Sequence, residues 1–264
     1  MTLKRGEQLT VLRTWTRPLF RRFQSGKFRE VTMYKGVIFD IDGTLYDYQA
    51  NDVRAMKDLC AFVERTVGVD EKTFRATYSQ ARTIVRGRLK DTAASHSRVL
   101  LMQTALELLG KNPFNHILQM YDVYWNYFID NMRPYDGAID FLRGLKAAGV
   151  KISVCTDMTA HVQYRKLAAL KLDRYVDFMV TSEETGYEKP APIMFEFALK
   201  KMHVAANEAA YFGDSLERDI QGAANVGIDP YWFVADREVS GGEQFKKIRT
   251  YRDAELRKFF GEQS

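Results

Sequence analysis

The chain has 264 residues, of which 46% are apolar and 28% charged, a composition typical of a globular enzyme and unlike that of a disordered chain. No apolar run approaches the roughly 20 residues needed to cross a bilayer. The two cysteines, Cys60 and Cys155, lie far apart in apolar surroundings, which favours free thiols and a reducing, cytoplasmic location. The four histidines show no metal-ligand spacing, which argues against zinc.

The positive charge is concentrated at the start of the chain. Residues 1–32 hold a net charge of +6, whereas the rest of the chain has a net charge of −1 and is not expected to bind nucleic acid. Apolar residues recur every four positions from Val11 to Phe23, a helical stripe that Pro18 interrupts. Three interpretations remain: a segment that binds a membrane surface or nucleic acid, a helix docked on the main domain, or a non-native or misassigned extension with the true start at Met33. The last is favoured, because a folded pattern begins directly after Met33.

The first predicted strand ends in two carboxylates. Residues 37–39 form a short apolar block that is typical of a strand buried on both faces, and Asp40 and Asp42 follow it before Gly43 and Thr44. In open α/β sheets, ligands bind in the crevice beyond the carboxyl ends of the strands. Two crowded carboxylates repel each other and are costly to desolvate, so a cation or a proton-transfer role is favoured over simple turn caps.

A helical block interrupts the sheet pattern after this strand. Residues 49–132 are rich in helix formers and poor in alternating pattern, with glycines and one Asn-Pro pair as punctuation. Helices are predicted near residues 50–67, 72–86, 94–109 and 114–131. The block is large enough for a small helical bundle.

From residue 133 onward, strands alternate with helices. Strands are predicted at 150–155, 178–181, 210–212 and 231–234, helices near 136–148, 160–170, 192–202 and 216–226, and a last helix near 242–261. This alternation predicts an α/β fold, a parallel sheet covered by helices on both faces. The expected division is an extension (1–32), a core (33–48 and 133–240), a helical insertion (49–132) and a helical tail (241–264).

Further polar residues are predicted at the same sheet edge as the two aspartates. Thr156 follows one strand, Lys189 precedes a helix, and Asp214 follows another strand, with Asp219 five residues later. Each has an ordinary explanation by itself, as a helix cap, a solvated lysine or a turn. Together they favour a site, because oxygen ligands without histidine suit Mg²⁺, and a lysine with a hydroxyl suits a phosphate.

These segments resemble the four ordered motifs of the haloacid dehalogenase superfamily. The motifs are the segment from Asp40 to Leu45, Thr156, Lys189-Pro190 and the segment from Gly213 to Asp219, within about residues 34–235. The helical block is similar to the cap of the phosphoglycolate phosphatase and β-phosphoglucomutase branch. The resemblance implies a Rossmann-like parallel sheet with a helical cap inserted after the first strand.

The resemblance also implies roles for the matched residues. Asp40 would attack phosphorus and form an aspartyl phosphate, and Asp42 would protonate the leaving oxygen and then activate water. Thr156 and Lys189 would bind the phosphoryl oxygens.

A Mg²⁺ cofactor is implied as well. The Asp40 and Asp214 carboxylates and the Asp42 main-chain carbonyl would hold it, and Asp219 would orient the metal shell or Lys189. True haloacid dehalogenases resemble this fold but lack the second aspartate, so Asp42 and Asp214 argue against that activity.

The predicted function is hydrolysis of a small phosphorylated metabolite. A phosphomutase acting on a sugar phosphate is the alternative, since the choice depends on how well a closed cap excludes water. A non-catalytic binding protein is disfavoured, because nucleophile, acid and lysine are all present. No pattern indicates an oligomeric state.

Substrate choice is expected to lie in the cap. Basic residues cluster in sequence around Gly87: Arg82, Arg86, Arg88, Lys90, His96 and Arg98. Arg86, Arg88 and His96 are candidates for binding a second anionic or polyhydroxyl group of the substrate. For each residue taken singly, a solvated helix face is the favoured alternative.

Overall fold

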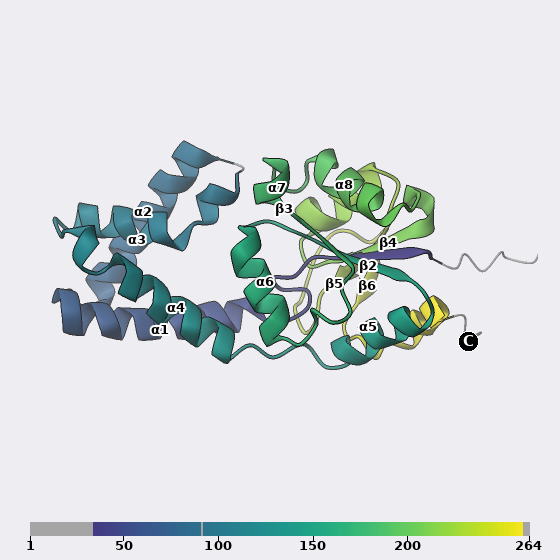
Figure 1. Ribbon diagram of the computed structural model, residues 1–264, viewed down its shortest axis with the longest axis horizontal. Helices are drawn as coiled ribbons and strands as arrows, with labels where there is room; N and C mark the ends of the chain where they lie inside the picture. Colours follow the sequence, from purple (N-terminus) through teal and green to yellow (C-terminus); the bar gives the residue numbers. More distant parts are fainter. Residues whose placement is uncertain (1–33, 91, 261–264) are drawn as a thin grey trace, which may run out of the picture. The chain divides into compact units, whose positions relative to one another are not determined.

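The computed structural model describes residues 34–90 and 92–260, and its central element is a parallel sheet (Figure 1). The described strands are β1 (Gly36–Phe39), β2 (Lys151–Thr156), β3 (Phe178–Thr181), β4 (Ala209–Gly213), β5 (Asp229–Phe233) and β6 (Lys246–Ile248), in the spatial order β3-β2-β1-β4-β5-β6. All pairs are parallel. The predicted α/β class with a Rossmann-like sheet is confirmed, and β1 lies at its centre, between β2 and β4.

Helices cover both faces of this sheet. They are α5 (Ala138–Ala147), α6 (Ala160–Ala169), α7 (Ser182–Thr185), α8 (Pro192–Met202) and α9 (Gly222–Asn225), with a short 3₁₀ turn η3 (Ala206–Glu208) and a π-helical turn η4 (Leu216–Gln221). Side chains of β1 alternate between the two apolar layers: Val37 and Phe39 pack with α5 and α6, and Ile38 packs with α8 and α9. The sheet is therefore buried on both faces, which explains the unbroken apolar run of β1.

Four α-helices lie between β1 and α5 among the described residues (Figure 1). They are α1 (Tyr48–Val67), α2 (Glu71–Leu89), α3 (Arg98–Leu108) and α4 (Ile117–Asp130), with 3₁₀ turns η1 (Ala93–His96) and η2 (Pro113–Asn115). The Asp47 side chain accepts a hydrogen bond from the Ala50 N–H at the start of α1, and Gly68 ends the helix in a left-handed conformation. The helical insertion after the first strand is confirmed, and residues 49–132 remain our proposed limits for the cap.

The C-terminal part of the chain differs from the predicted helix near residues 242–261. Lys246–Ile248 form β6, which pairs with β5 at the edge of the sheet, and a 3₁₀ helix, η5 (Ala254–Phe260), follows. Gly241 and Gly242 have positive φ angles of 78° and 65°, which prevent a helix from beginning there. The side chain of Phe259 is buried against the sheet.

The prediction for the start of the chain is not tested. The basic segment of residues 1–32 falls outside the described residues, so its three interpretations stay predictions. Within residues 34–90 and 92–260, no helix is long and apolar enough to cross a membrane.

Candidate active site

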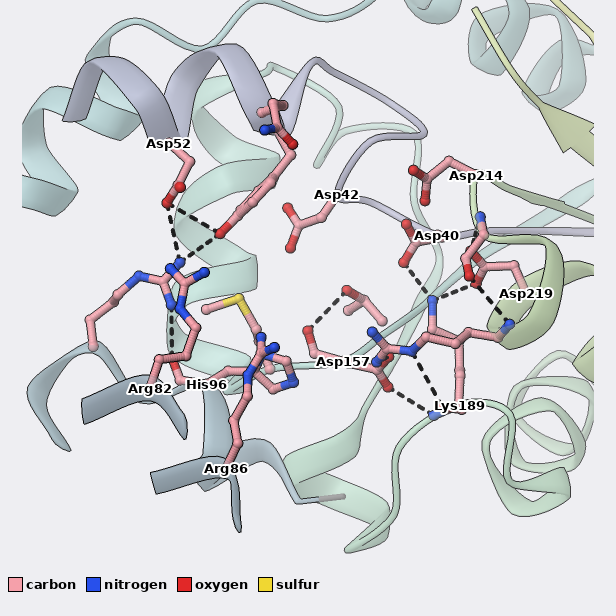
Figure 2. A pocket seen from close by; sticks show the side chains of 17 residues that line it. Asp40, Asp42, Asp52, Arg82, Arg86, His96, Asp157, Lys189, Asp214 and Asp219 are labelled. Carbon is pink, nitrogen blue, oxygen red and sulfur yellow. Dashed lines mark hydrogen bonds and ion pairs between the residues drawn. The ribbon is translucent and has the colours of Figure 1, made fainter. Parts of the chain in front are cut away.

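A cavity of about 330 Å³ lies at the carboxyl edge of the sheet and is closed on its other side by the helical insertion (Figure 2). The residues predicted for catalysis, phosphate binding and metal binding all line it: Asp40, Asp42, Thr156, Lys189, Asp214 and Asp219. They meet because parallel strands end at one edge: β1, β2 and β4 place their last residues, or those directly after them, beside one another.

Asp40 is almost fully buried, and its carboxylate accepts two side-chain hydrogen bonds. The Lys189 ammonium donates to Asp40 Oδ1 at 2.6 Å and to Asp219 Oδ1 at 2.7 Å. The Thr44 hydroxyl donates to Asp40 Oδ2 at 3.2 Å. Burial raises the pKa of Asp40 well above its ordinary value, and Lys189 opposes this shift.

Asp42 is bound by two residues of α6 that the sequence patterns did not indicate. The Lys166 ammonium, fully buried, lies 2.7 Å from both carboxylate oxygens of Asp42. The Gln163 amide donates to Asp42 Oδ2 at 3.2 Å and to Thr156 Oγ1 at 2.7 Å. Tyr46 donates from its hydroxyl to Asp42 Oδ1. Burial alone would raise the pKa of Asp42, but Lys166 and these hydrogen bonds outweigh it, so the pKa is lowered.

A sequence signal for these two residues existed. Gln163 and Lys166 are three positions apart and therefore lie on the same face of a helix. The same helix carries the buried residues Val162 and Leu167, which lie next to Gln163 and Lys166 in the sequence. Gln163 and Lys166 therefore lie on the buried side of the helix. Polar side chains on the apolar face of a helix need partners, and a carboxylate at the neighbouring strand end supplies one.

Gly43 allows Asp214 to approach the end of β1. Its φ angle is 89°, and a Cβ atom at this position would lie 2.5 Å from Asp214 Oδ2. The Arg237 guanidinium donates to the same oxygen at 2.9 Å. Burial and the nearby charge of Asp219 raise the pKa of Asp214 to about 6, against the opposing effect of Arg237.

The residues present fit a divalent cation. Carboxylate oxygens of Asp40, Asp214 and Asp219 lie within 4.8 Å of one another. An all-oxygen donor set with excess negative charge suits a hard ion such as Mg²⁺. Both oxygens of Asp219 already accept hydrogen bonds, one from Lys189 and one from the Ser215 N–H, which favours an orienting role for Asp219 over direct ligation.

The cap contributes a basic side to the cavity. Arg82, Arg86 and His96 line it opposite the aspartates (Figure 2), whereas Arg88 is not among the lining residues. His96 Nε2 lies 2.8 Å from Glu188 Oε1, a contact between the cap and the segment that carries Lys189. Two of the three candidates for substrate recognition are therefore brought to the cavity.

Known proteins share both the sequence and the fold. Residues 34–227 match the family model of haloacid dehalogenase-like hydrolases. The chain is 36% identical over 225 residues to ribulose-1,5-bisphosphate 5-phosphatase of Halopiger xanaduensis, covering 84% of this chain and 94% of that protein. It is 29% identical to glyceraldehyde 3-phosphate phosphatase of Methanocaldococcus jannaschii, covering 74% and 83%. The crystal structure of a HAD phosphatase from Thermococcus onnurineus superposes with a TM-score of 0.64 at 25% identity, covering 86% and 98%.

The chain belongs to the haloacid dehalogenase-like hydrolases. Within this family it is a phosphatase, a hydrolase of phosphoric monoesters with a helical insertion after the first strand. The resemblance inferred from the four motifs is thereby confirmed. A fold relative at 22% identity, the hydrolase YfnB of Bacillus subtilis, was solved bound to magnesium and has a TM-score of 0.64, covering 87% of this chain and 99% of that one.

Proposed function

We propose that this protein is a Mg²⁺-dependent phosphatase that hydrolyses a small sugar phosphate through an aspartyl-phosphate intermediate. The observation that carries the proposal is the convergence of Asp40, Asp42, Lys189 and Asp214 in one cavity. The substrates named for two relatives, ribulose 1,5-bisphosphate and glyceraldehyde 3-phosphate, are both sugar phosphates, which supports this substrate class.

The first step transfers the phosphoryl group to Asp40. A carboxylate oxygen of Asp40 attacks phosphorus while the bond from phosphorus to the sugar oxygen breaks. Lys189 and Thr156 bind the phosphoryl oxygens and favour the charge that develops on them. Asp42 gives a proton to the leaving sugar oxygen.

The second step returns Asp40 to its free form. Asp42, now ionised, takes a proton from a water molecule that attacks phosphorus, and inorganic phosphate leaves. Lys166 favours the ionised form of Asp42 that this step needs. A bound phosphate is negatively charged and therefore opposes the effect of Lys166 on Asp42. Its charge favours the protonated carboxyl group of Asp42 that the first step requires.

Mg²⁺ would be held by the carboxylates of Asp40 and Asp214 and by the main-chain carbonyl of Asp42. When bound, it supplies positive charge that neutralises the phosphoryl oxygens. Asp219 would keep Lys189 in place, since their side chains lie 2.7 Å apart.

Phosphate release tests the proposal. We expect hydrolysis of p-nitrophenyl phosphate, ribulose 5-phosphate and glyceraldehyde 3-phosphate with Mg²⁺, and loss of activity without it. Absence of released phosphate from every compound would overturn the proposal. An isomeric sugar phosphate formed without free phosphate would indicate the mutase alternative, which the phosphatase relatives disfavour.

A further inference from the structure

The cap side of the cavity carries positive charge that no carboxylate among the described residues balances. Arg82 and Arg86 lie four positions apart on α2, so both project from the same face of the helix, and both line the cavity. Like charges at this spacing destabilise a helix. Arginine pairs held in this way against a cavity are suited to an anion that enters it.

Arg98, the third cap arginine at the cavity, has a carboxylate partner and serves as a comparison. Its guanidinium lies 3.4 Å from Asp52 Oδ1, donates to the Tyr48 hydroxyl at 2.6 Å and lies over the ring of Tyr124. It is also almost fully buried. Arg98 therefore belongs to the internal structure of the cap.

Arg82 lies over the ring of Tyr78, but neither Arg82 nor Arg86 has a carboxylate partner among the described residues. Within residues 34–90 and 92–260, neither forms an ion pair with a carboxylate, and the buried Nε atom of Arg82 makes no hydrogen bond. Glu188, an acidic side chain on the core side whose charge acts on Arg86, already lies 2.8 Å from His96 and 3.6 Å from Arg218. Burial, together with repulsion from Arg82 and Arg98, lowers the pKa of Arg86.

The geometry points to a second anion subsite formed by Arg82 and Arg86, and we propose that the substrate is a bisphosphorylated sugar. One phosphate would lie at Asp40, and these two arginines would bind the other. This inference rests on the proposed function and names its substrate class. Figure 2 shows Arg82 and Arg86 across the cavity from Asp40 and Lys189, as two phosphates at opposite ends of one molecule would require.

A phosphate fits this subsite better than a carboxylate. Two guanidinium groups carry two positive charges, which match a phosphate dianion, and each guanidinium offers parallel N–H donors for two phosphate oxygens. The cavity volume of about 330 Å³ lies within the range of about 300–1,000 Å³ that is usual for small-molecule sites. It can therefore hold a ligand larger than the transferred phosphoryl group.

The test compares two substrates that differ only in the second phosphate. Ribulose 1,5-bisphosphate and ribulose 5-phosphate share the 5-phosphate, and the ratio of their kcat/KM values measures what the 1-phosphate contributes. We expect wild-type protein to favour the bisphosphate at least tenfold, and Arg82→Gln and Arg86→Gln each to lower the ratio about tenfold, as loss of a charged hydrogen bond implies.

Arg88→Gln is the matched control, because Arg88 lies on the same helix but does not line the cavity. It should keep the wild-type ratio. Arg86→Lys, which keeps the charge but not the paired donors, should give an intermediate ratio. A ratio unchanged in both Arg82→Gln and Arg86→Gln, or an equal loss for both substrates, would overturn the subsite.

Two further measurements complete the experiment: a comparison with a carboxylate-bearing substrate and a measurement of binding. 3-Phosphoglycerate carries a carboxylate in place of the aldehyde of glyceraldehyde 3-phosphate. If it is favoured over that aldehyde, while the bisphosphate is not favoured over ribulose 5-phosphate, the phosphate assignment is wrong. Calorimetric titration of the Asp40→Asn protein with ribulose 1,5-bisphosphate should show weaker binding once Arg86→Gln is added.

Failure of the subsite and failure of the proposed function give different results. A protein that hydrolyses p-nitrophenyl phosphate but shows no preference for the bisphosphate contradicts only the subsite. A protein that releases no phosphate contradicts the proposed function, and the calorimetric comparison still decides whether Arg82 and Arg86 bind the bisphosphate.

Discussion

The two sides of the cavity balance their charges in different ways. On the core side, aspartates at the strand ends have cationic partners within 3 Å: Asp40 with Lys189, Asp42 with Lys166 and Asp214 with Arg237. On the cap side, Arg82 and Arg86 of α2 have no carboxylate partner in the part of the chain that the structure describes. The difference indicates that the core side is organised before a ligand arrives, whereas the cap side is completed by one.

This contrast suggests that the two sides of the cavity have different roles. On the core side, the buried ammonium groups of Lys189 and Lys166 fix the positions of Asp40 and Asp42, because a charge that loses its partner is costly in a buried site. On the cap side, Arg82 and Arg86 have no carboxylate partner among the described residues, so both guanidinium groups remain available to bind a substrate. Changes on the core side should therefore affect turnover, and changes on the cap side should affect selection among substrates.

The largest effect is expected for Asp40→Asn. An amide is a poor nucleophile, so phosphate release from p-nitrophenyl phosphate should fall at least about 10⁴-fold. The fold should persist, because Lys189 keeps its contact with Asp219. Asp122→Asn, at an exposed position of α4, should retain wild-type activity. Near wild-type turnover of the Asp40→Asn protein would rule out Asp40 as the nucleophile.

Removal of the metal ion is expected to have the next largest effect. A chelator should lower activity at least about 100-fold, and added Mg²⁺ should restore it. In the Asp214→Asn protein, the Mg²⁺ concentration needed for half-maximal activity should rise roughly tenfold or more, because a charged ligand becomes neutral. Asp236→Asn, at an exposed position after β5, should leave that concentration unchanged. Equal Mg²⁺ requirements of the Asp214→Asn and wild-type proteins would contradict the metal assignment.

Loss of Lys166 should have an intermediate effect. Lys166→Met keeps much of the side-chain volume but removes the cation that holds Asp42, so kcat should fall about 10- to 100-fold, with a smaller change in KM. Arg165→Met is the matched control, since Arg165 binds only Asn126 among the described residues and lies nearer the surface. In an Asp42→Asn background, Lys166→Met should add little. Fully additive losses would show that Lys166 acts independently of Asp42.

The core-side residues were predictable because their signals are local. Asp40, Thr156 and Asp214 each come directly at or after an apolar strand, and the carboxyl ends of parallel strands share one edge. Strand and helix alternation was likewise sufficient to predict the α/β fold. These patterns depend on a few neighbouring residues and do not require knowledge of distant contacts.

Features set by distant contacts were not predictable. Lys166 binds an aspartate 124 positions away. The buried neighbours Val162 and Leu167 could indicate that its side of the helix is buried, but no local pattern identifies Asp42 as its partner. The strand β6 is only three residues long, Lys-Lys-Ile, and lacks alternation; pairing with β5 defines it. The 3₁₀ helix after it replaces a predicted α-helix because Tyr251 and Phe259 pack against the sheet.

The smallest effect is expected in the stability of the cap. Arg86→Gln removes one of two like charges at helical spacing, a repulsion of about 0.2–0.5 kcal/mol. Arg86 and Arg88 both lie in the last turn of α2, where the helix dipole favours a cation, so Arg88→Gln loses the same dipole interaction without relieving this repulsion. The midpoint of thermal unfolding of the Arg86→Gln protein should therefore lie about 1 °C above that of the Arg88→Gln protein, since about 1 kcal/mol corresponds to roughly 2–4 °C in a domain of this size. Scanning calorimetry in low salt without ligand measures the shift, and Arg88→Gln provides the comparison on the same helix.

The salt dependence of this shift makes the test sharper. Exposed charges interact less at high ionic strength, so the gain in the Arg86→Gln protein should shrink when salt is raised to about 1 M, where the screening length is about 3 Å. An unfolding temperature of the Arg86→Gln protein below that of the Arg88→Gln protein would mean that Arg86 stabilises the cap itself. In that case the contrast between the two sides of the cavity would not hold. A variant that is more stable yet less selective for the bisphosphate would show that the protein retains Arg86 for the ligand, at a cost to its own stability.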